Sequence, residues 1–160
     1  MTIKTPRPRR ILVVEPDGIV ASAYRLALAQ GADHVHLAAS TQDAIERIQQ
    51  GGYDAIVVAP EFLPDVRGNR ALRHLRVHTK AAFLTLFDHL PSLDERAAAT
   101  AGGDDFLVKP VSVRGLLDKV RRLPMVSCAT GDIGSTLSVP RTGGCGHAHA
   151  VMAALSPNRI

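Results

Sequence analysis

The sequence contains no tryptophan, and aromatic residues make up only 4% of its 160 residues. A folded core must therefore come from aliphatic side chains, and hydrophobic residues do reach 46% of the chain. No apolar run approaches the roughly 20 residues that a membrane-spanning helix needs. The charges near the N-terminus are not followed by the apolar segment of a signal peptide. We expect a cytoplasmic protein without a membrane partner.

Cysteine is also scarce, and the spacing of Cys128 and Cys145 fits no disulfide, redox or zinc motif. Two groups could still offer ligands to a metal ion. His34 and His36 fall on one face of an expected strand, and residues 145–149 (Cys-Gly-His-Ala-His) hold soft and borderline ligands. Neither group has an evident third partner in a regular element, so the sequence predicts no metal site at either place.

Acidic residues are missing from the first ten positions, which carry four of the 19 Lys and Arg residues. The other 150 residues therefore balance 15 basic against 15 acidic side chains. A basic arm over residues 1–8 could touch phosphates or remain a solvated terminus. Since the rest of the chain is neutral, nucleic acid is not an expected partner.

Charge is sparse again after residue 123, where only Asp132, Arg141 and Arg159 are ionisable at neutral pH apart from histidine. Gly, Ser, Thr and Pro are scattered through this stretch, and it lacks the periodic apolar residues of a second domain. A DNA-reading helix-turn-helix is therefore not expected. We predict a domain over 9–123 and a C-terminal tail over 124–160.

Within 9–123, short apolar runs alternate with segments of helical periodicity. Strands are expected over 10–15, 35–38, 54–59, 81–86 and 106–108, and helices over 18–30, 41–50, 70–77, 93–101 and 112–123. Asp17, Ser40, Ser92 and Ser112 precede helices as capping residues. Five strands alternating with five helices predict an α/β fold with a doubly wound parallel sheet. The flavodoxin-like strand order 2-1-3-4-5 places a site at the carboxyl edge of strands one and three.

Five sequence features resemble the receiver (CheY-like) domain of bacterial two-component response regulators. The most specific is Gly-Gly-Asp-Asp-Phe-Leu-Val-Lys-Pro over 102–110; the others are Ile11–Glu15, Tyr53-Asp54, Pro64 with Gly68, and Thr85. In that family an Asp ending strand three accepts a phosphoryl group, Mg²⁺ binds the nearby acids, and a Lys contacts the phosphoryl group. The resemblance implies a role in phosphorelay signal transduction.

Matched by position, most of the pocket residues of that family have counterparts. The resemblance assigns Thr85 to the switch hydroxyl, Phe106 to the rotating aromatic residue, and Lys109 with Pro110 to the Lys-Pro pair, whose peptide bond is usually cis in the family. Glu15 matches the first acid, while the second falls on Pro16, one step before Asp17. Mg²⁺ requires several well-placed carboxylates. Glu15 is the only acid that matches a magnesium ligand of the family by position, so no cofactor is expected.

The phosphoacceptor is the part that does not match. Counting along the strand from Asp54 places it at Ala59, and counting back from Pro64 places it at Pro60; neither side chain can accept a phosphoryl group. Glu61 would face the same side as Ala59 if the strand stayed extended, giving a fixed negative charge beside Lys109. The alternative is a solvated loop glutamate. Lys109 itself is expected to pair with Glu15, Asp17 or Glu61.

These observations predict a receiver that works by contact rather than catalysis, a pseudo-receiver and not an enzyme. Its surface would be helix 93–101, strand 106–108 and helix 112–123, where Arg114, Arg121 and Arg122 could meet an acidic partner. The expected partners are a histidine kinase, another regulator, an output protein or a second copy of the chain. The alternative is a weakly phosphorylatable receiver that uses Mg²⁺ with an offset carboxylate, namely Glu61, Asp65 or Asp17.

Overall fold

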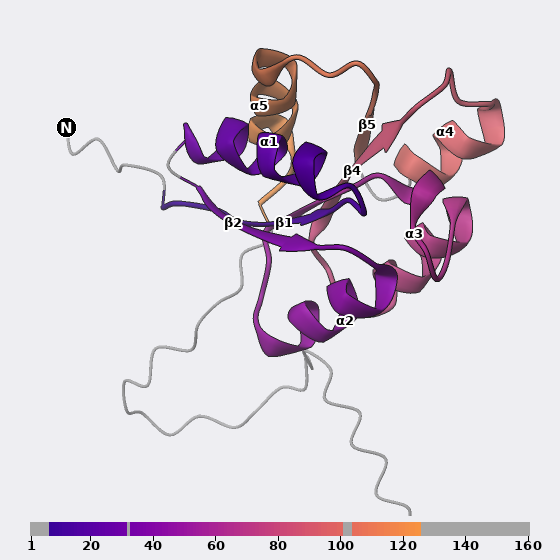
Figure 1. The fold of residues 1–160 in the computed structure, drawn as a ribbon, viewed down its shortest axis with the longest axis horizontal. Coiled ribbons are helices and arrows are strands. Elements are labelled where there is room, and N and C mark those ends of the chain that lie inside the picture. Colours follow the sequence, from indigo (N-terminus) through magenta and orange to yellow (C-terminus); the bar gives the residue numbers. More distant parts are fainter. Residues whose placement is uncertain (1–6, 32, 101–103, 126–160) are drawn as a thin grey trace, which may run out of the picture. The chain divides into compact units, whose positions relative to one another are not determined.

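A single parallel sheet of five strands forms the centre of the domain (Figure 1). The structure is a computed structural model, and it describes residues 7–31, 33–100 and 104–125. The strand order is β2-β1-β3-β4-β5, as the sequence predicts. The strands are β1 (Arg10–Val14), β2 (His34–Ala38), β3 (Ala55–Val58), β4 (Ala82–Phe87) and β5 (Asp105–Val108).

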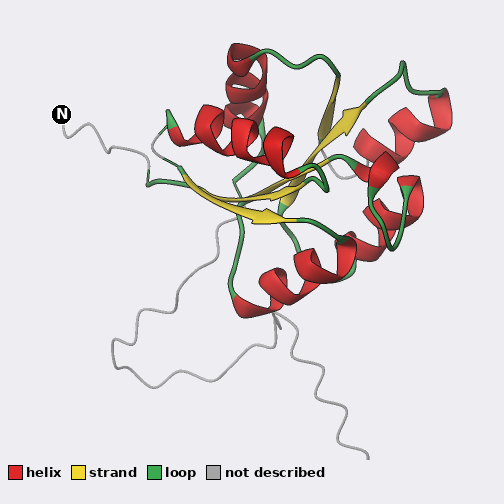
Figure 2. Ribbon diagram, in the orientation of Figure 1, coloured by secondary structure: helices red, strands yellow, loops and turns green. Residues whose placement is uncertain are grey.

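In the described part of the chain, four α-helices and one short 3₁₀ helix connect the strands, and a fifth α-helix follows β5 (Figure 2). They are α1 (Gly18–Ala29), α2 (Thr41–Gln50), η1 (Pro60–Phe62), α3 (Gly68–Arg76), α4 (Leu93–Thr100) and α5 (Val113–Arg122). Within the described ranges, none of the helices is long and apolar enough to cross a membrane.

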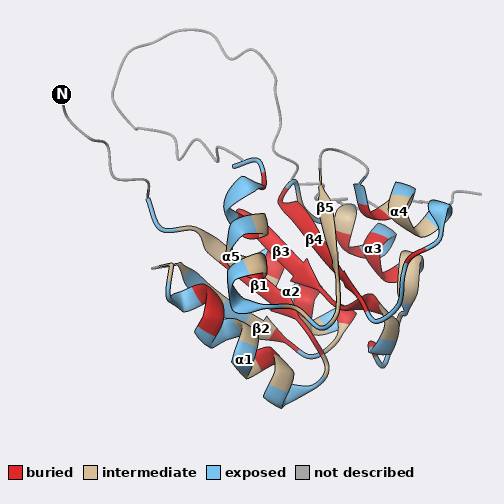
Figure 3. Cartoon of the chain, turned by 90° about the horizontal axis from the view of Figure 1, so that it is seen from above, coloured by how far each residue is buried: buried red, intermediate tan, exposed pale blue. Residues whose placement is uncertain are grey.

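The two faces of the sheet pack into separate apolar layers because successive strand residues point to opposite sides. In β1, Ile11 and Val13 join the layer covered by α1 and α5, while Leu12 and Val14 join the layer covered by α2 and α3. Figure 3 shows that β1, β3 and β4 are buried along their lengths, while β5 is only partly covered. The continuous apolar sequences of the central strands fit this arrangement, because both of their faces are covered.

The helix starts follow the predicted capping residues. Asp17 accepts hydrogen bonds from the backbone N–H groups of Ile19 and Val20. Ser40 accepts one from Asp43, and Ser112 one from Gly115. Ser92 and Glu95 form a reciprocal capping box, with Ser92 N–H donating to the Glu95 carboxylate at 2.7 Å and Glu95 N–H to the Ser92 hydroxyl at 3.3 Å.

The described end of the basic arm is bound to the domain rather than solvated. The Arg7 guanidinium pairs with the buried Asp54 carboxylate at 2.6 Å, and Asp54 also accepts the backbone N–H of Arg10. The Arg9 guanidinium donates to the backbone carbonyls of Val120 and Arg121 at the end of α5. Residues 1–6 lie outside the described part of the chain.

Element boundaries differ from the predicted ones mainly around β3. This strand ends at Val58, and η1 follows it where an extended continuation was expected. The reason is local, since Pro60 fixes φ near the helical value and suits the first position of a helical turn. Helix α3 begins at Gly68, two residues before the predicted start. The 124–160 tail, with Cys128, Cys145 and the His residues near it, falls beyond the described range except for Pro124 and Met125.

Candidate functional site at the carboxyl edge of the sheet

The ends of β1, β3 and β4 bring four predicted site positions to one edge of the sheet. Glu15 follows β1 and donates its N–H to Ala38, and Ala59 follows β3 and donates its N–H to Val14. Thr85 in β4 is paired in register with Val58 of β3. Lys109, directly after β5, donates its N–H to the carbonyl of Phe87. The predicted position of the site is therefore the place where these strands end.

Lys109 lies between two carboxylates. Its Nζ is 3.2 Å from Glu15 Oε2 and 3.2 Å from Asp88 Oδ1. Burial by itself would lower the pKa of Lys109, but attraction to Glu15 and hydrogen bonds to Glu15 and Asp88 outweigh it and raise the pKa above its ordinary value. Lys109 is thus a cation whose charge is already matched inside the domain.

Of the three predicted partners of Lys109, only Glu15 is confirmed. Among the described ion pairs, none joins Lys109 to Asp17 or Glu61. The second partner, Asp88, was not predicted. Its position immediately after β4 is the signal that could have identified it, since the carboxyl ends of neighbouring parallel strands meet at one edge.

Glu15 is buried, with its side chain 4% exposed, and its two oxygens have separate partners. Oε2 pairs with Lys109, and Oε1 accepts the backbone N–H of Asp17 at 3.1 Å. The Asp17 carboxylate faces the start of α1, where it caps the helix. The described residues contain no group of three His, Cys, Asp or Glu side chains that could hold a metal ion. A magnesium site at Glu15 therefore does not fit this donor set.

The residue after β3 is Ala59, whose side chain is 1% exposed. The next residue, Pro60, is also buried and begins η1. Proline has no backbone N–H, so position 60 can donate no hydrogen bond to an anion. Of the two positions counted from the sequence, Ala59 is the one directly at the end of the strand.

Glu61 lies neither beside Lys109 nor free in solvent, so both expectations for this side chain are wrong. Because η1 turns the chain, Glu61 points toward the loop after β4: its Oε1 is 3.0 Å from His89 Nδ1, at ion-pair distance without hydrogen-bond geometry, and its Oε2 accepts the backbone N–H of Asp88 at 3.3 Å. Burial, followed by a side-chain hydrogen bond with Asp88, raises the pKa of Glu61 above its ordinary value.

His89 connects this loop to α4. Its Nε2 lies 3.4 Å from the Glu95 carboxylate in the first turn of α4, and its ring packs against Phe87 at 6.2 Å between centroids. Backbone and side-chain hydrogen bonds from Ser92, then His89, lower the pKa of Glu95. Sequence reasoning missed His89, because its role depends on two carboxylates that come close only in the fold. The β4–α4 loop is thereby held at both ends by acidic side chains.

Thr85 is fully buried, and its hydroxyl has no hydrogen-bond partner among the described residues. Phe106 is half-buried in β5, with its ring 6.0 Å from that of Phe87 in an edge-on arrangement. The Arg96 guanidinium lies over the Phe106 ring, 5.9 Å from its centroid. The Lys109-Pro110 peptide bond is cis, as the resemblance implies.

Asp65 and the α5 arginines make no described hydrogen bond or ion pair with Glu15, Lys109 or Asp88. Asp65 accepts backbone N–H groups from Thr41 and Gln42 at the start of α2. Arg114, Arg121 and Arg122 are exposed on α5. Lys119 of the same helix pairs with Asp105 of β5 at 2.5 Å.

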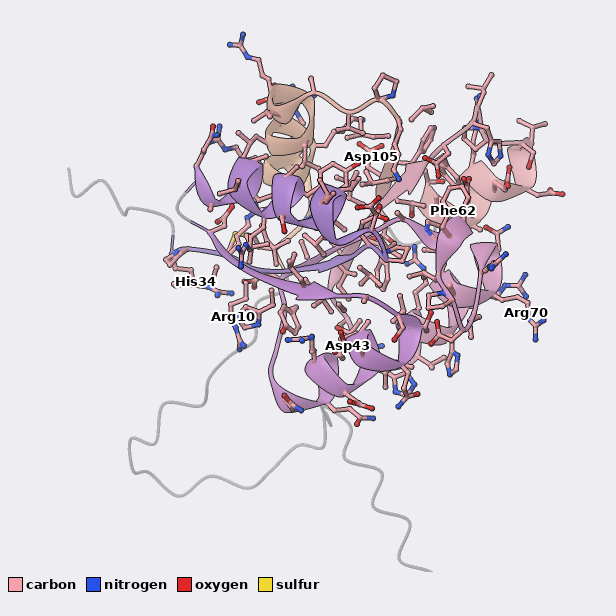
Figure 4. The ribbon with its side chains drawn as sticks, viewed as in Figure 1. Arg10, His34, Asp43, Phe62, Arg70 and Asp105 are labelled. Carbon is pink, nitrogen blue, oxygen red and sulfur yellow. The ribbon has the colours of Figure 1, made fainter. Side chains whose placement is uncertain are left out.

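Among the described residues, His34 and His36 belong to no group of three potential metal ligands. His34 is exposed near the amino end of the strand (Figure 4), while His36 Nδ1 lies 2.7 Å from the Tyr53 hydroxyl. Burial and the nearby Arg10 and Arg47 charges lower the pKa of His36.

Comparison with known proteins gives the family. The family model of the response regulator receiver domain matches residues 11–121. The chain belongs to the response regulator receiver family. It is 33% identical over 119 residues to the transcriptional regulatory protein TrcR of Mycobacterium tuberculosis, covering 72% of this chain and 45% of TrcR. It is 32% identical over 117 residues to the response regulator MprA of Mycolicibacterium vanbaalenii, covering 72% of this chain and 50% of MprA.

This receiver chain thus spans about half the length of the curated relatives it matches. Its fold is similar to that of the Vibrio cholerae chemotaxis protein CheY4, with a TM-score of 0.66 at 20% identity over 74% of this chain and all of CheY4. Receiver domains are signalling modules of two-component systems. The family membership confirms the resemblance carried by residues 102–110 and the strand ends.

Proposed function

We propose that this receiver acts in two-component signalling by contact with a partner protein, without phosphorylation of an aspartate. The observation that supports the proposal is Ala59 at the end of β3, followed by Pro60. A phosphoryl acceptor must be a nucleophile, and here the position holds a methyl group. The proposal includes that the chain is not an enzyme, needs no Mg²⁺ and works in the cytoplasm.

The state of Lys109 supports the same proposal. An incoming phosphoryl group would have to compete with Glu15 and Asp88, each 3.2 Å from the ammonium nitrogen. Thr85 is also fully buried, so its hydroxyl does not reach solvent in this conformation. The arrangement favours a fixed pocket in which carboxylates occupy the cation.

The alternative of an offset carboxylate has less support. Each of the three candidates has another role: Asp17 caps α1, Asp65 caps α2, and Glu61 pairs with His89. Using any of them would require breaking these contacts. We therefore keep phosphorylation as the outcome that the experiment must be able to detect.

The experiment is incubation of the purified chain with acetyl phosphate and Mg²⁺, followed by intact-mass measurement. A receiver with an aspartate after β3 serves as the positive control, and it must gain one phosphoryl mass under the same conditions. We expect no added mass on this chain. A hydroxylamine-labile phosphoryl adduct would overturn the proposal, and peptide mapping would then identify the carboxylate.

The partner surface of this proposal is the one expected from the sequence, formed by α4, β5 and α5. Its basic residues are Arg114, Arg121 and Arg122, which are exposed. A histidine kinase, another regulator, an output protein or a second copy of the chain could bind there. Substituting these arginines by glutamate tests the surface separately from the phosphorylation experiment.

A further inference from the structure

Helix α3 carries a second basic surface that the proposed function does not use. From Val66 to Phe87 the sequence has five Arg and Lys residues and no Asp or Glu. Arg70, Arg73 and Val77 are exposed, while Ala71, Leu72 and Leu75 face the core. At 100° per residue, the first three lie together on the side of the helix opposite the buried residues. We call Arg70, Arg73 and Val77 the α3 face.

The cations of the α3 face are not neutralised within the domain. Several other basic side chains pair with a carboxylate, as in Arg7–Asp54, Arg47–Asp43, Arg76–Asp104 and Lys119–Asp105. Among the residues that the structure describes, no ion pair involves Arg70 or Arg73. Figure 4 shows Arg70 pointing away from the body of the domain. These guanidinium groups are available to an outside anion.

The position of Arg70 is unfavourable for the helix itself. It lies in the first turn of α3, which has no acidic residue and no side-chain cap at Arg67. The start of a helix carries partial positive charge and favours anions, so cations here oppose helix stability. Because Arg70 has no described structural contact that offsets this cost, its position supports a role in binding.

Val77 indicates which kind of anion the face suits. This apolar side chain is 77% exposed at the end of α3, one turn beyond Arg73. The phosphate backbone of a nucleic acid offers charge but no apolar group for Val77 to contact. Protein interfaces, in contrast, combine arginine side chains with apolar side chains. Arginine also forms bidentate pairs with carboxylates. The face therefore fits a protein segment that presents carboxylates beside one apolar side chain.

The surroundings of α3 also disfavour nucleic acid. The helix contacts both α2 and α4, whereas a helix that reads the major groove protrudes from its domain (Figure 1). Glu46 on α2 and Asp94 on α4 are exposed on these neighbours. Such carboxylates would repel a continuous polyanion, while a protein can place its own charges between them.

We infer that the α3 face binds an acidic segment of a partner protein, with Arg70 and Arg73 pairing with carboxylates and Val77 making the apolar contact. This surface is distinct from the α4, β5 and α5 surface of the proposed function. It does not depend on whether the chain accepts a phosphoryl group. A receiver with two basic surfaces could hold two protein segments at once.

The test uses a fluorescent synthetic helical peptide that places two glutamates and one leucine on one face, with binding followed by anisotropy at physiological salt. Two peptides serve as controls: one with glutamine for glutamate, and one with the same composition scrambled off a single face. Duplex DNA and phosphatidylserine vesicles are the competing ligands. We expect the acidic amphipathic peptide to bind most tightly.

Arg70→Glu is the decisive variant, and Arg25→Glu is its matched control. Arg25 is an exposed arginine of α1 that lies on neither proposed surface, so the change in charge is the same. We expect Arg70→Glu to weaken peptide binding about tenfold, as the loss of a charge-assisted pair implies. Arg25→Glu should change it less than about twofold, and neither variant should lower the melting temperature by more than a surface substitution does.

Val77→Asn, with Ile19→Asn at an exposed β-branched residue of α1 as control, tests the apolar contact by the same measurement. Equal loss of binding in the α3 and α1 variants would overturn the inference while leaving the proposed function intact. Equal affinity for the glutamine or scrambled peptide would overturn it as well. Tighter binding of DNA or of the vesicles would replace the acidic protein segment with that ligand.

Discussion

The guanidinium of Arg76, in the last turn of α3, forms an ion pair with the carboxylate of Asp104, which is only 4% exposed. Asp104 also accepts the backbone N–H of Phe83 in β4 at 2.9 Å, and Arg76 lies over the Phe83 ring at 4.6 Å. The same guanidinium reaches the backbone carbonyls of Ala98 and Ala99 in α4. This ion pair, whose carboxylate is buried, thus connects α3, α4, β4 and the residue before β5.

Removing the cation of this pair should be costly. Arg76→Met leaves Asp104 as a buried charge without its ion-pair partner, and we expect a loss of about 3–5 kcal/mol in the free energy of unfolding. Urea denaturation measures the loss. Arg73→Met on the same helix is the control and should change stability by no more than about 0.5 kcal/mol. Similar losses in the two variants would mean that the Arg76–Asp104 pair contributes no more to the free energy of unfolding than an exposed arginine of the same helix.

The pair of Lys109 and Glu15 should show strong energetic coupling. Lys109→Met leaves the buried Glu15 carboxylate with only the Asp17 N–H, and we expect it to cost about 3 kcal/mol. Combining it with Glu15→Gln should recover about 1–3 kcal/mol of the summed single-variant losses. A double-mutant cycle by chemical denaturation measures this coupling, and strict additivity would contradict it.

The same pair gives a pH dependence. The pKa of Lys109 is raised in the folded domain, so its contribution to stability is complete below the ordinary lysine value of 10.5. It should be lost as the pH rises through the higher folded value. Wild type and Lys109→Met should therefore converge in stability at strongly alkaline pH, and an unchanged gap there would be evidence against the pair.

Gly68 occupies a backbone conformation that other residues avoid. Its φ angle is +59°, so the cost of Gly68→Ala comes from the backbone, although nothing lies within 4 Å of the added methyl group. We expect a loss of about 1–2 kcal/mol. Gly18→Ala is the matched control, since its methyl group also meets nothing within 4 Å and its φ is not positive. That control should be neutral or slightly stabilising by thermal melting, and equal losses would rule out the conformational explanation.

Asp65 should stabilise the domain as a carboxylate. Burial tends to raise its pKa, but hydrogen bonds from the backbone N–H groups of Thr41, Gln42 and Val66 outweigh burial and lower the pKa below the ordinary 3.8. Its contribution is then present above pH 3.8 and lost as the pH falls through the lower folded value.

Asp65→Asn keeps the shape of the side chain and removes its charge, at an expected cost of about 1 kcal/mol at pH 7. The gap between wild type and variant should close in strongly acidic solution. Asp94→Asn, at an exposed acid of α4 for which no hydrogen bond is described, controls for net charge and should show a much smaller gap. A gap independent of pH would exclude the charge as its cause.

Local sequence signals predicted the frame of the domain because they depend on neighbours along the chain. The continuous apolar run from Ile11 to Val14 predicted a buried strand, and Asp17, Ser92 and Ser112 marked helix starts through hydrogen bonds that span two or three residues. The turn at Pro60 was missed because strand counting assumed an extended chain. Proline at the first position of a short helical turn was the available signal.

The site was less predictable because its contacts join residues far apart in sequence. Asp88 and Glu15 share Lys109, and His89 lies between Glu61 and Glu95, only after the ends of β1, β3, β4 and β5 come together. Arg7 pairs with Asp54 across 47 positions for the same reason. Residue types suggested charges in these places, but not which charges meet.

Pro60 bears on any attempt to build phosphotransfer chemistry into this domain. Ala59→Asp would place a carboxylate at the end of β3, yet the following residue would still lack a backbone N–H. Lys109 would still be shared between Glu15 and Asp88. A designed phosphoacceptor would therefore also need changes at position 60 and around the Lys109 ammonium group.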